Sequence, residues 1–305
     1  MKNNNIYAIG AAGVKWGSVE KAQWLAVQNV KRSYADDVLS HLDALASQFE
    51  IKEYASLDYA TGTFALFALS SLAWHKSKPN ILITGGVHGY ETSGVFGALR
   101  FAASAAQEYH DRFNLMIVPC VSPWAYETIN RWNPDAIDPN RSFYTGSPAQ
   151  ESAALMKFVS GLNFLMHIDL HETTDTDNSE FRPALGARDA VEHKEWAIPD
   201  GFYTVGDTLN PCTEFQKAII QAVEKVTHIA PADENGKIIG EFLQQKGVIN
   251  YAIKALNLCA GLTSAKFVST TEVYPDSANV DNENCIQAQV AAVTGALDYI
   301  SSHID

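Results

Sequence analysis

The sequence has few cysteines and no long apolar run. Among 305 residues, the four cysteines lie far apart and form no Cys-x-x-Cys pair: Cys120, Cys212, Cys259 and Cys285. Small secreted domains rely on dense disulfides, so this usage favours buried thiols in a reducing compartment. No run approaches the roughly 18 apolar residues that cross a bilayer, and the amino terminus lacks the sustained apolar core of a signal peptide. These absences predict a cytoplasmic protein.

Basic residues are also scarce relative to acidic ones. The chain has 22 Lys and Arg against 35 Asp and Glu, a formal net charge of −13. Such a charge repels phosphate backbones and anionic lipid surfaces, which excludes nucleic acid and membranes as expected partners. We find no internal repeat, low-complexity tract or linker. We therefore expect one domain over 1–305, with 1–50 as an N-terminal helical segment packed on it.

Apolar runs of strand length alternate with stretches of helical periodicity. The predicted strands are 51–57, 64–74, 80–87, 114–121 and 163–170. The predicted helices are 19–49, 91–109, 149–162, 214–226 and 284–304. This alternation indicates an α/β fold with a mixed, largely parallel central sheet and helices on both faces.

Three polar segments follow predicted strands: His-Gly-Tyr-Glu at 88–91, Asp-Pro-Asn-Arg at 138–141 and Asp-Leu-His at 169–171. Ligands of such sheets bind beyond the carboxyl ends of the strands. Two His and one Glu are a common catalytic zinc set that leaves a position for water, and His88, Glu91 and His171 provide one. Asn and Arg side chains bind carboxylates. The pattern predicts an enzyme that holds a substrate carboxylate while metal-activated water attacks a nearby amide.

Each segment has a simpler interpretation when taken alone. A His-x-x-Glu pair often occurs by chance, and 131–141 contains the turn residues of an ordinary surface loop. The glycines at 85, 86 and 89 favour the metal interpretation, because they let the chain leave the strand and turn sharply.

A second histidine, His167, lies on the same predicted strand as His171. Four residues of strand separate them by about 13 Å, so they cannot bind one ion together. We expect His171 to be the ligand, His167 to be a core or supporting histidine, and Asp169 to be a hydrogen-bond acceptor. The carboxylates nearest in sequence to His171 are Asp169, Glu172 and Asp175. They could hold a second ion, although a solvated acidic loop is the simpler interpretation.

The segment Arg-Trp-Asn-Pro-Asp-Ala-Ile-Asp-Pro-Asn-Arg at 131–141 resembles the Arg-x-Asn-x-x-Gly-x-Asp-Leu-Asn-Arg stretch of the zinc carboxypeptidase family. With the order and spacing of His-x-x-Glu and Asp-x-Asn-Arg, the resemblance runs from about residue 54 to the carboxyl terminus. It implies a carboxypeptidase-like fold and one Zn²⁺ bound by His88, Glu91 and His171. Two departures stand in the segment: Ala136 replaces the family's usual Gly, and Pro139 its usual Leu. Both could alter the loop and thus the precision of the carboxylate clamp.

The resemblance also implies roles for five other residues. Asn140 and Arg141 would bind the substrate's terminal carboxylate, Arg141 in a bidentate pair. Arg131 would stabilise the oxyanion, and Asp138 would accept a hydrogen bond from the far ring nitrogen of His88. The family's general base is a glutamate on a late strand before a final helix, which Glu272 matches.

The family also carries a mobile tyrosine ahead of this glutamate, and Tyr251 lies near the right distance. The residues that would select a substrate side chain fall within about 201–265, where no motif guides the alignment.

Three functions compete on this evidence. The first is a metallocarboxypeptidase acting on the C-terminal peptide bond. The second is a deacylase of N-acyl amino acids, similar to succinylglutamate desuccinylase and aspartoacylase. Those relatives usually end in a β-rich module, whereas this chain ends in a predicted helix, and the spacing from Arg131 to Asn140 fits the peptidases better. The third is a non-catalytic metal-binding relative, disfavoured by the retained base and arginines, since a purely structural zinc site is normally closed by four protein ligands.

Overall fold

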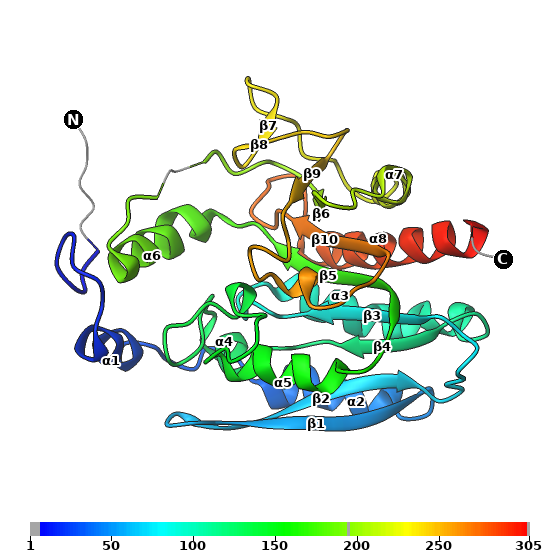
Figure 1. Ribbon diagram of the computed structural model, residues 1–305, viewed down its shortest axis with the longest axis horizontal. Helices are drawn as coiled ribbons and strands as arrows, with labels where there is room; N and C mark the ends of the chain where they lie inside the picture. Colours follow the sequence, from blue (N-terminus) through cyan, green and yellow to red (C-terminus); the bar gives the residue numbers. More distant parts are fainter. Residues whose placement is uncertain (1–6, 194–195, 304–305) are drawn as a thin grey trace.

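An eight-stranded sheet runs through the protein in the computed structural model, which describes residues 7–193 and 196–303. Its strands are β1 (Phe49–Tyr59), β2 (Gly62–Ser71), β3 (Asn80–Gly85), β4 (Asn114–Val118), β5 (Phe164–Glu172), β6 (Tyr203–Asp207), β9 (Val248–Tyr251) and β10 (Phe267–Val273). The order is β1-β2-β4-β3-β5-β10-β6-β9 (Figure 1). The central strands β4, β3, β5 and β10 are parallel, β1 and β2 form an antiparallel hairpin, and β6 runs antiparallel to β10. The short strands β7 (Lys237–Ile238) and β8 (Glu241–Phe242) pair with each other.

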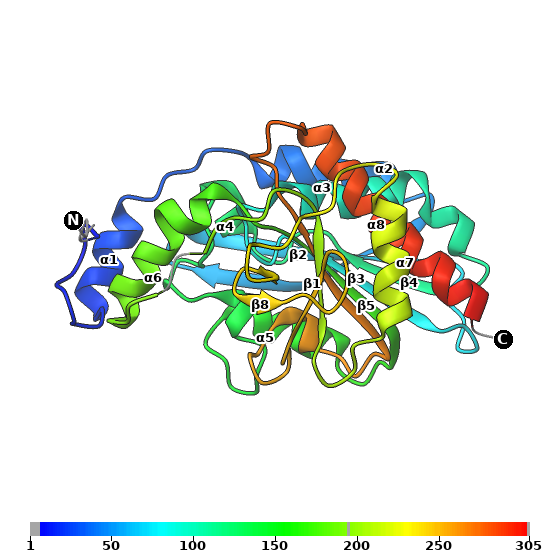
Figure 2. The ribbon, with the colours of Figure 1, turned by 90° about the horizontal axis from the view of Figure 1, so that it is seen from above.

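Helices cover both faces of this sheet. The α-helices are α1 (Ser18–Ala26), α2 (Ser40–Leu45), α3 (Thr92–Ser104), α4 (Pro123–Thr128), α5 (Gln150–Val159), α6 (Arg182–Asp189), α7 (Thr213–Val223) and α8 (Asn282–His303). The short turns of other helix types are η1 (Ala35–Leu39), η2 (Ala106–Tyr109), η3 (Pro139–Arg141), η4 (Asp177–Phe181) and η5 (Cys259–Gly261). Helices α2, α3 and α8 lie on one face, with α7 against α8, and α5 lies on the other (Figure 2). The expected α/β fold with a largely parallel sheet is confirmed.

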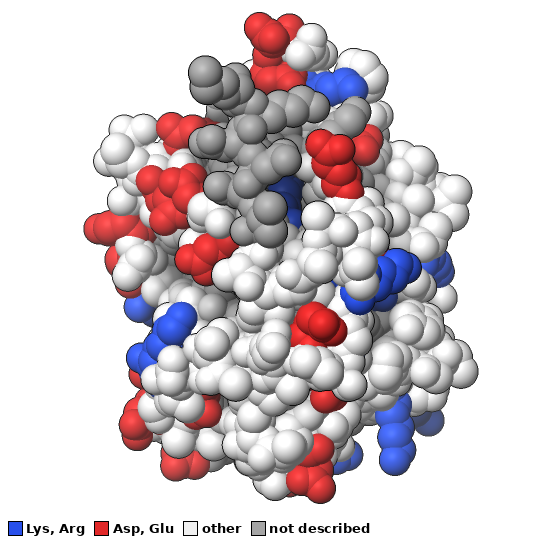
Figure 3. Space-filling model, turned by 90° about the vertical axis from the view of Figure 1, so that its left-hand side faces the viewer, with Lys and Arg blue, Asp and Glu red and all other residues white. Residues whose placement is uncertain are grey.

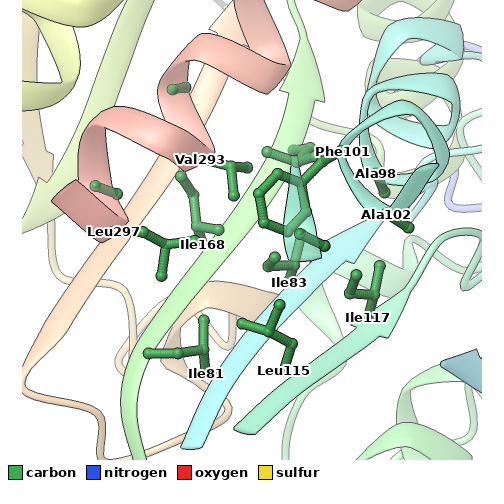
Figure 4. Packing of buried hydrophobic residues seen from close by; sticks show 14 of the residues in the cluster. Ile81, Ile83, Ala98, Phe101, Ala102, Leu115, Ile117, Ile168, Val293 and Leu297 are labelled. Carbon is green, nitrogen blue, oxygen red and sulfur yellow. The ribbon is translucent and has the colours of Figure 1, made fainter. Parts of the chain in front are cut away.

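The largest part of the core lies between the sheet and the pair α3 and α8. Val293 and Leu297 of α8, with Phe101 of α3, pack on the aliphatic side chains of the parallel strands (Figure 4). Ile83 and Ile168 on these strands are fully buried. Both faces of a central parallel strand are covered by helices, which explains why these strands read as continuous apolar runs.

Several predicted elements differ in extent from the observed ones, and two of the differences are informative. The helical periodicity of 19–49 corresponds to α1, η1 and α2, with residues 27–33 non-helical between α1 and η1. The strand predicted over 80–87 ends at Gly85, because Gly86 takes a left-handed φ of +61° that a strand cannot contain. The last residue of the predicted final helix, residue 304, lies outside the described residues.

Periodicity did not predict β6, β9, α4 or α6. Strands β6 and β9 are short and lie on the far side of β10, where they extend the sheet. Helices α4 and α6 have six and eight residues, less than the span over which helical periodicity becomes visible.

The distribution of acidic side chains and the burial of most cysteines agree with what the composition predicts. Acidic side chains are spread over the face that carries α1 and α6, rather than gathered into one patch (Figure 3). Cys120, Cys259 and Cys285 are buried free thiols, and Cys212 is partly exposed. Within the part of the chain that the structure describes, no helix combines the length and apolarity needed to cross a bilayer.

Candidate metal and substrate site

The structure brings the three predicted ligands together at the carboxyl ends of the parallel strands. His88 follows β3, Glu91 is the residue before the first turn of α3, and His171 is near the end of β5. One candidate ligand atom from each lies within 4.8 Å of the other two. All three side chains are buried, with 1–2% of each residue exposed. Adjacent parallel strands end at the same edge of the sheet, which is why His88 and His171, far apart in the sequence, meet here.

Two glycines shape the turn that carries His88 and Glu91. Gly86 adopts φ +61°, which reverses the chain at the end of β3 at little cost for glycine. Gly89 has no such φ, and glycine is required there for a different reason. A Cβ at this position would lie 1.9 Å from the carbonyl carbon of Ala125 and 2.0 Å from the amide nitrogen of Tyr126. The turn therefore packs directly on the backbone of α4.

Both imidazoles point Nδ1 at the carboxylate of Glu91. His88 Nδ1 lies 2.7 Å from Glu91 Oε1, and His171 Nδ1 lies 2.6 Å from Glu91 Oε2. The second contact is close but lacks hydrogen-bond geometry, so Glu91 Oε2 is a buried oxygen without a hydrogen-bond partner. Buried polar atoms in native proteins are normally satisfied. A cation between the three side chains would satisfy this one, so the residues fit a metal.

The outer nitrogens of the two histidines are held by carboxylates. His88 Nε2 donates to Asp138 Oδ1 at 2.9 Å, as predicted from the family, and His171 Nε2 donates to Asp169 Oδ2 at 2.7 Å. These bonds assign the proton to Nε2 and leave Nδ1 free to coordinate. Burial disfavours the anion of Asp138, but the neighbouring Arg131 and His88 outweigh it and hold the pKa of Asp138 well below its usual range.

Without an ion, His171 compensates the charge of Glu91. Burial alone would favour neutral imidazole, yet Glu91 and Asp169 outweigh it and raise the pKa of His171. The same pairing lowers the pKa of Glu91 to about 2 against the opposing effect of burial. Zinc requires the neutral imidazole, so an ion would take the place of this proton.

Arg131 is fixed by two acids and a tyrosine. Its Nε donates to Asp138 Oδ2 at 3.0 Å, and its Nη1 donates to Asp177 Oδ1 and to the Tyr90 hydroxyl, both at 3.2 Å. Nη2 takes part in none of these bonds. The guanidinium lines the cavity beside the ligands, so its position is set while one nitrogen remains available.

The loop 133–141 accommodates both departures from the family pattern. Ala136 adopts φ +56°, the left-handed conformation in which glycine is favoured. The methyl group of Ala136 therefore makes this backbone conformation less favourable than it would be for glycine. Pro139 begins η3, and Asp138 caps this turn by accepting from Asn140 N at 2.9 Å. Proline suits such a first position because its φ is already close to helical.

Asn140 and Arg141 lie on the same cavity wall. Asn140 Oδ1 accepts from Cys259 N at 2.8 Å, which directs its Nδ2 toward the ring of His171. Because His171 Nε2 already donates to Asp169, the hydrogens of Asn140 Nδ2 have no acceptor on that nitrogen. Arg141 is exposed to the cavity and donates from Nη1 to the carbonyl of Asn140 at 2.8 Å.

The cavity that these residues line has a volume of about 460 Å³. Its lining includes the three candidate metal ligands, Arg141, Tyr251 and the apolar residues Val205 and Leu258. Burial and the nearby Glu272 raise the pKa of Tyr251 to about 12, so this tyrosine is a neutral hydroxyl at pH 7. The volume falls in the ordinary range of small-molecule sites.

Glu272 stands beside His171 in the sheet. The two residues are direct partners in the parallel pairing of β10 and β5, and Glu272 also lines the cavity. Its Oε2 accepts from Thr173 Oγ1 at 2.9 Å, and this hydroxyl in turn contacts the Tyr203 hydroxyl at 2.7 Å. Burial raises the pKa of Glu272 to about 8, with a further contribution from Glu91. A cation bound nearby would lower the pKa of Glu272 and favour its carboxylate form.

A second cluster lies under the first. His167, Asp169 and Cys259 are buried together, and Thr84 Oγ1 links them by donating to Asp169 Oδ1 and contacting His167 Nε2. Burial lowers the pKa of His167 to about 4, which makes it the neutral supporting histidine expected from the sequence.

The acidic residues considered for a second ion are not solvated as a group. Glu172 is buried and accepts from Ser93 N, whereas Asp175 is exposed and accepts from the Tyr274 hydroxyl. Among the described residues, neither belongs to a cluster with metal-ligand spacing.

Sequence reasoning missed residues that complete the site. Asp177 and Tyr90 hold Arg131, and Arg182 of α6 lines the outer cavity. Tyr90 could have been found, because it lies within the His88–Glu91 turn. Asp177 carries no comparable local signal, since its partner lies 46 residues away.

Residues 77–201 match a family described as the succinylglutamate desuccinylase/aspartoacylase catalytic domain. No curated protein matches the chain significantly. A candidate metallopeptidase from Shewanella denitrificans has a similar structure, with a TM-score of 0.62 and 20% identity over 86% of this chain and 88% of that one. A metallo-carboxypeptidase from Burkholderia cenocepacia aligns with a TM-score of 0.60 and 17% identity over 87% and 68%. Bovine thrombin-activatable fibrinolysis inhibitor aligns with a TM-score of 0.57 and 12% identity over 96% and 99%.

At these identities the structural matches establish the fold alone, which is that of the metallo-carboxypeptidases. Together with the match over residues 77–201, they support the resemblance to the zinc carboxypeptidases in the broad sense that includes the succinylglutamate desuccinylase and aspartoacylase relatives. The match over residues 77–201 and the fold support the expectation of an enzyme, a metal-dependent hydrolase.

Proposed function

We propose that the protein is a zinc-dependent metallocarboxypeptidase that cleaves the C-terminal peptide bond of its substrate. The observation that carries the proposal is the pairing of Glu272 with His171 on adjacent strands, at a cavity that Arg141 also lines. A base, a metal ligand and a carboxylate-binding cation thus face one space, the arrangement that peptide hydrolysis at a free carboxyl terminus requires.

One Zn²⁺ would be held by His88 Nδ1, His171 Nδ1 and the carboxylate of Glu91. Three protein ligands leave a position open, as in catalytic rather than structural zinc sites. When bound, the ion supplies Lewis-acid polarisation of a carbonyl and lowers the pKa of water. Asp138 and Asp169 orient the two imidazoles toward it.

Glu272 is the proposed general base. Its carboxylate takes a proton from the attacking water and passes it to the leaving nitrogen. Thr173 orients the carboxylate through Oε2, which leaves Oε1 for the proton. Arg131, held by Asp138 and Asp177, would donate from Nη2 to the developing oxyanion.

The substrate carboxylate would bind to Arg141 and to Asn140 Nδ2. Cys259 N fixes the amide of Asn140 so that its nitrogen is the free end. The neutral hydroxyl of Tyr251 lines the same part of the cavity and would donate a further hydrogen bond to the substrate.

A second candidate is a deacylase of N-acyl amino acids, favoured by the family match over 77–201. Its substrates also carry a free carboxylate, so the same clamp would serve. The carboxypeptidase proposal is preferred because α8 follows Glu272 directly and the sheet continues through β10, β6 and β9.

The test is hydrolysis by the zinc-loaded protein of two substrate panels, blocked dipeptides and N-acyl amino acids including N-succinylglutamate. The control proteins are Glu272→Gln and Glu241→Gln, the latter an exposed glutamate on β8. Release of C-terminal amino acids that is lost only in Glu272→Gln supports the carboxypeptidase. Turnover of the N-acyl panel alone would transfer the protein to the deacylases. No turnover of either panel would contradict both.

A further inference from the structure

Arg32 connects the N-terminal segment to the metal-ligand turn. It lies between α1 and η1, outside the residues of the family match. Its Nη2 donates to the carbonyl of Gly89, and its Nη1 donates to Thr92 Oγ1 at 2.7 Å. Its Nε donates to the carbonyl of Tyr126 at 2.6 Å, and the guanidinium carbon lies 3.7 Å from the centre of the Tyr126 ring. Each of the three guanidinium nitrogens of Arg32 therefore donates a hydrogen bond.

The acceptors of these bonds surround the two ligands. Gly89 lies between His88 and Glu91, and Thr92 is the first residue of α3, directly after Glu91. The distance between His88 and Glu91 depends on the path of this turn. Two backbone contacts also anchor it: Tyr90 N donates to Asn130 O at 3.2 Å, and Gly89 packs on the backbone of α4. The single side chain of Arg32 therefore links the turn to the start of α3 and to α4.

The rest of the N-terminal segment supports this placement. Trp24 packs against Trp124 and Trp132, and Gln28 accepts from Asn130 Nδ2 at 2.9 Å. These contacts hold α1 against the loop from which Arg131 extends, so Arg32 reaches the turn from a segment that is itself fixed.

We infer that Arg32 is a positioning residue that holds the His88–Glu91 turn in its metal-binding shape, so that the N-terminal segment is part of the site. The planar guanidinium meets three acceptors in different directions, which a lysine ammonium on its single stem cannot reproduce. The inference rests on the proposed function only in taking His88 and Glu91 as metal ligands. The bracing of the turn is a property of the protein without metal.

The experiment compares Arg32→Lys with Tyr34→Phe in the 305-residue chain. Tyr34 is a matched control, because it lies in the same segment and its hydroxyl donates to the Ala65 carbonyl at 3.0 Å, away from the turn. Hydrogen exchange is measured on the metal-free proteins, and Zn²⁺ affinity by competition with a chromophoric chelator. Urea unfolding then compares the general stability of the two variants.

In Arg32→Lys, amides of residues 86–93 are expected to exchange faster, and Zn²⁺ binding to weaken about tenfold, at the lower end of what residues supporting metal ligands contribute. Tyr34→Phe is expected to leave the exchange of residues 86–93 and the Zn²⁺ affinity unchanged. This should hold even if its urea midpoint falls as far as that of Arg32→Lys.

Unchanged exchange over 86–93 in Arg32→Lys would overturn the inference. So would equal changes in both variants, which would indicate a loss of general stability alone. If the wild-type protein bound no Zn²⁺ or hydrolysed neither substrate panel, the proposed function would fail, while the exchange measurement would still decide the role of Arg32.

Discussion

Asp138 couples the imidazole of His88 to the guanidinium of Arg131, accepting 2.9 Å from His88 Nε2 through one oxygen and 3.0 Å from Arg131 Nε through the other. A single carboxylate thus orients a proposed metal ligand and the proposed oxyanion donor. Its negative charge also compensates the buried arginine, so the two functions of the site depend on one residue.

Asp138→Asn is expected to weaken Zn²⁺ binding about 10- to 100-fold. The amide can still accept from His88, but its nitrogen would then face Arg131 Nε and lose that bond. Chelator competition measures the affinity, with Asp135→Asn as the control, an exposed residue of the same loop. Wild-type affinity in Asp138→Asn would show that the orientation of His88 does not depend on this carboxylate.

Arg141→Met is expected to lower kcat/KM for substrates with a free carboxylate by about 10- to 100-fold, the range of a hydrogen bond to a charged group. The same substrates with the carboxyl group amidated should be hydrolysed equally by both proteins, because the lost interaction involves the carboxylate. Steady-state kinetics on such pairs measure the effect. The control is Arg112→Met, whose Nη1 bonds the Ser301 carbonyl far from the cavity. An equal loss on both substrates would argue against a carboxylate clamp.

Glu151 is expected to make stability depend on pH. It is buried, accepting from the Tyr59 hydroxyl at 2.6 Å and from Asn133 Nδ2 at 3.2 Å, and burial raises its pKa. The folded protein therefore keeps a proton that the unfolded chain releases at about pH 4.5. Stability falls as pH rises from there to the folded pKa, by about 1.4 kcal/mol for each pH unit between the two values.

The measurement is urea unfolding of the wild type and Glu151→Gln at pH 5 and pH 8. The uncharged glutamine removes this titration, so the wild type should lose free energy of unfolding relative to Glu151→Gln at the higher pH. Glu108→Gln, at an exposed glutamate, should show no such trend. A difference between wild type and Glu151→Gln that is the same at both pH values would contradict the expectation.

Ala136→Gly is expected to stabilise the protein by about 0.5–1 kcal/mol. The left-handed φ of +56° costs a residue with a Cβ about 1–2 kcal/mol, which glycine would avoid. The greater conformational freedom of glycine in the unfolded chain offsets part of this stabilisation. Thermal or urea unfolding measures the change. Ala153→Gly, within α5, should have the opposite sign, with a loss of about 1 kcal/mol. Destabilisation in Ala136→Gly would mean that its methyl group contributes packing that exceeds the backbone cost.

The central part of the fold was predictable from local patterns. Residues 80–85, 114–118 and 164–172 form buried strands; the first two are apolar runs of strand length, and the third carries apolar residues at alternate positions from Met166 onward. His88 follows β3 and His171 lies at the end of β5, so their meeting at one edge follows from the parallel arrangement. The shorter elements β6, β9, α4 and α6 could not be predicted, because their sequences are too short to show a period.

The contacts that complete the site depend on pairs far apart in the chain. Asp177 reaches Arg131, and Arg32 reaches Gly89 over 57 residues, and no local pattern marks either pair. The role of glycine at 89 was likewise not the one that sequence suggests. It permits contact with the backbone of α4 rather than an unusual φ.

The sequence by itself determined the α/β class, the candidate metal ligands and the candidate carboxylate-binding pair, because apolar periodicity and the chemistry of a residue are properties of short segments. Only the tertiary structure decided which nitrogen of each histidine faces Glu91, which partners hold Arg131, and how the N-terminal segment braces the ligand turn. Those features arise from close packing between distant segments, and packing selects one geometry among the many that the same local sequences allow.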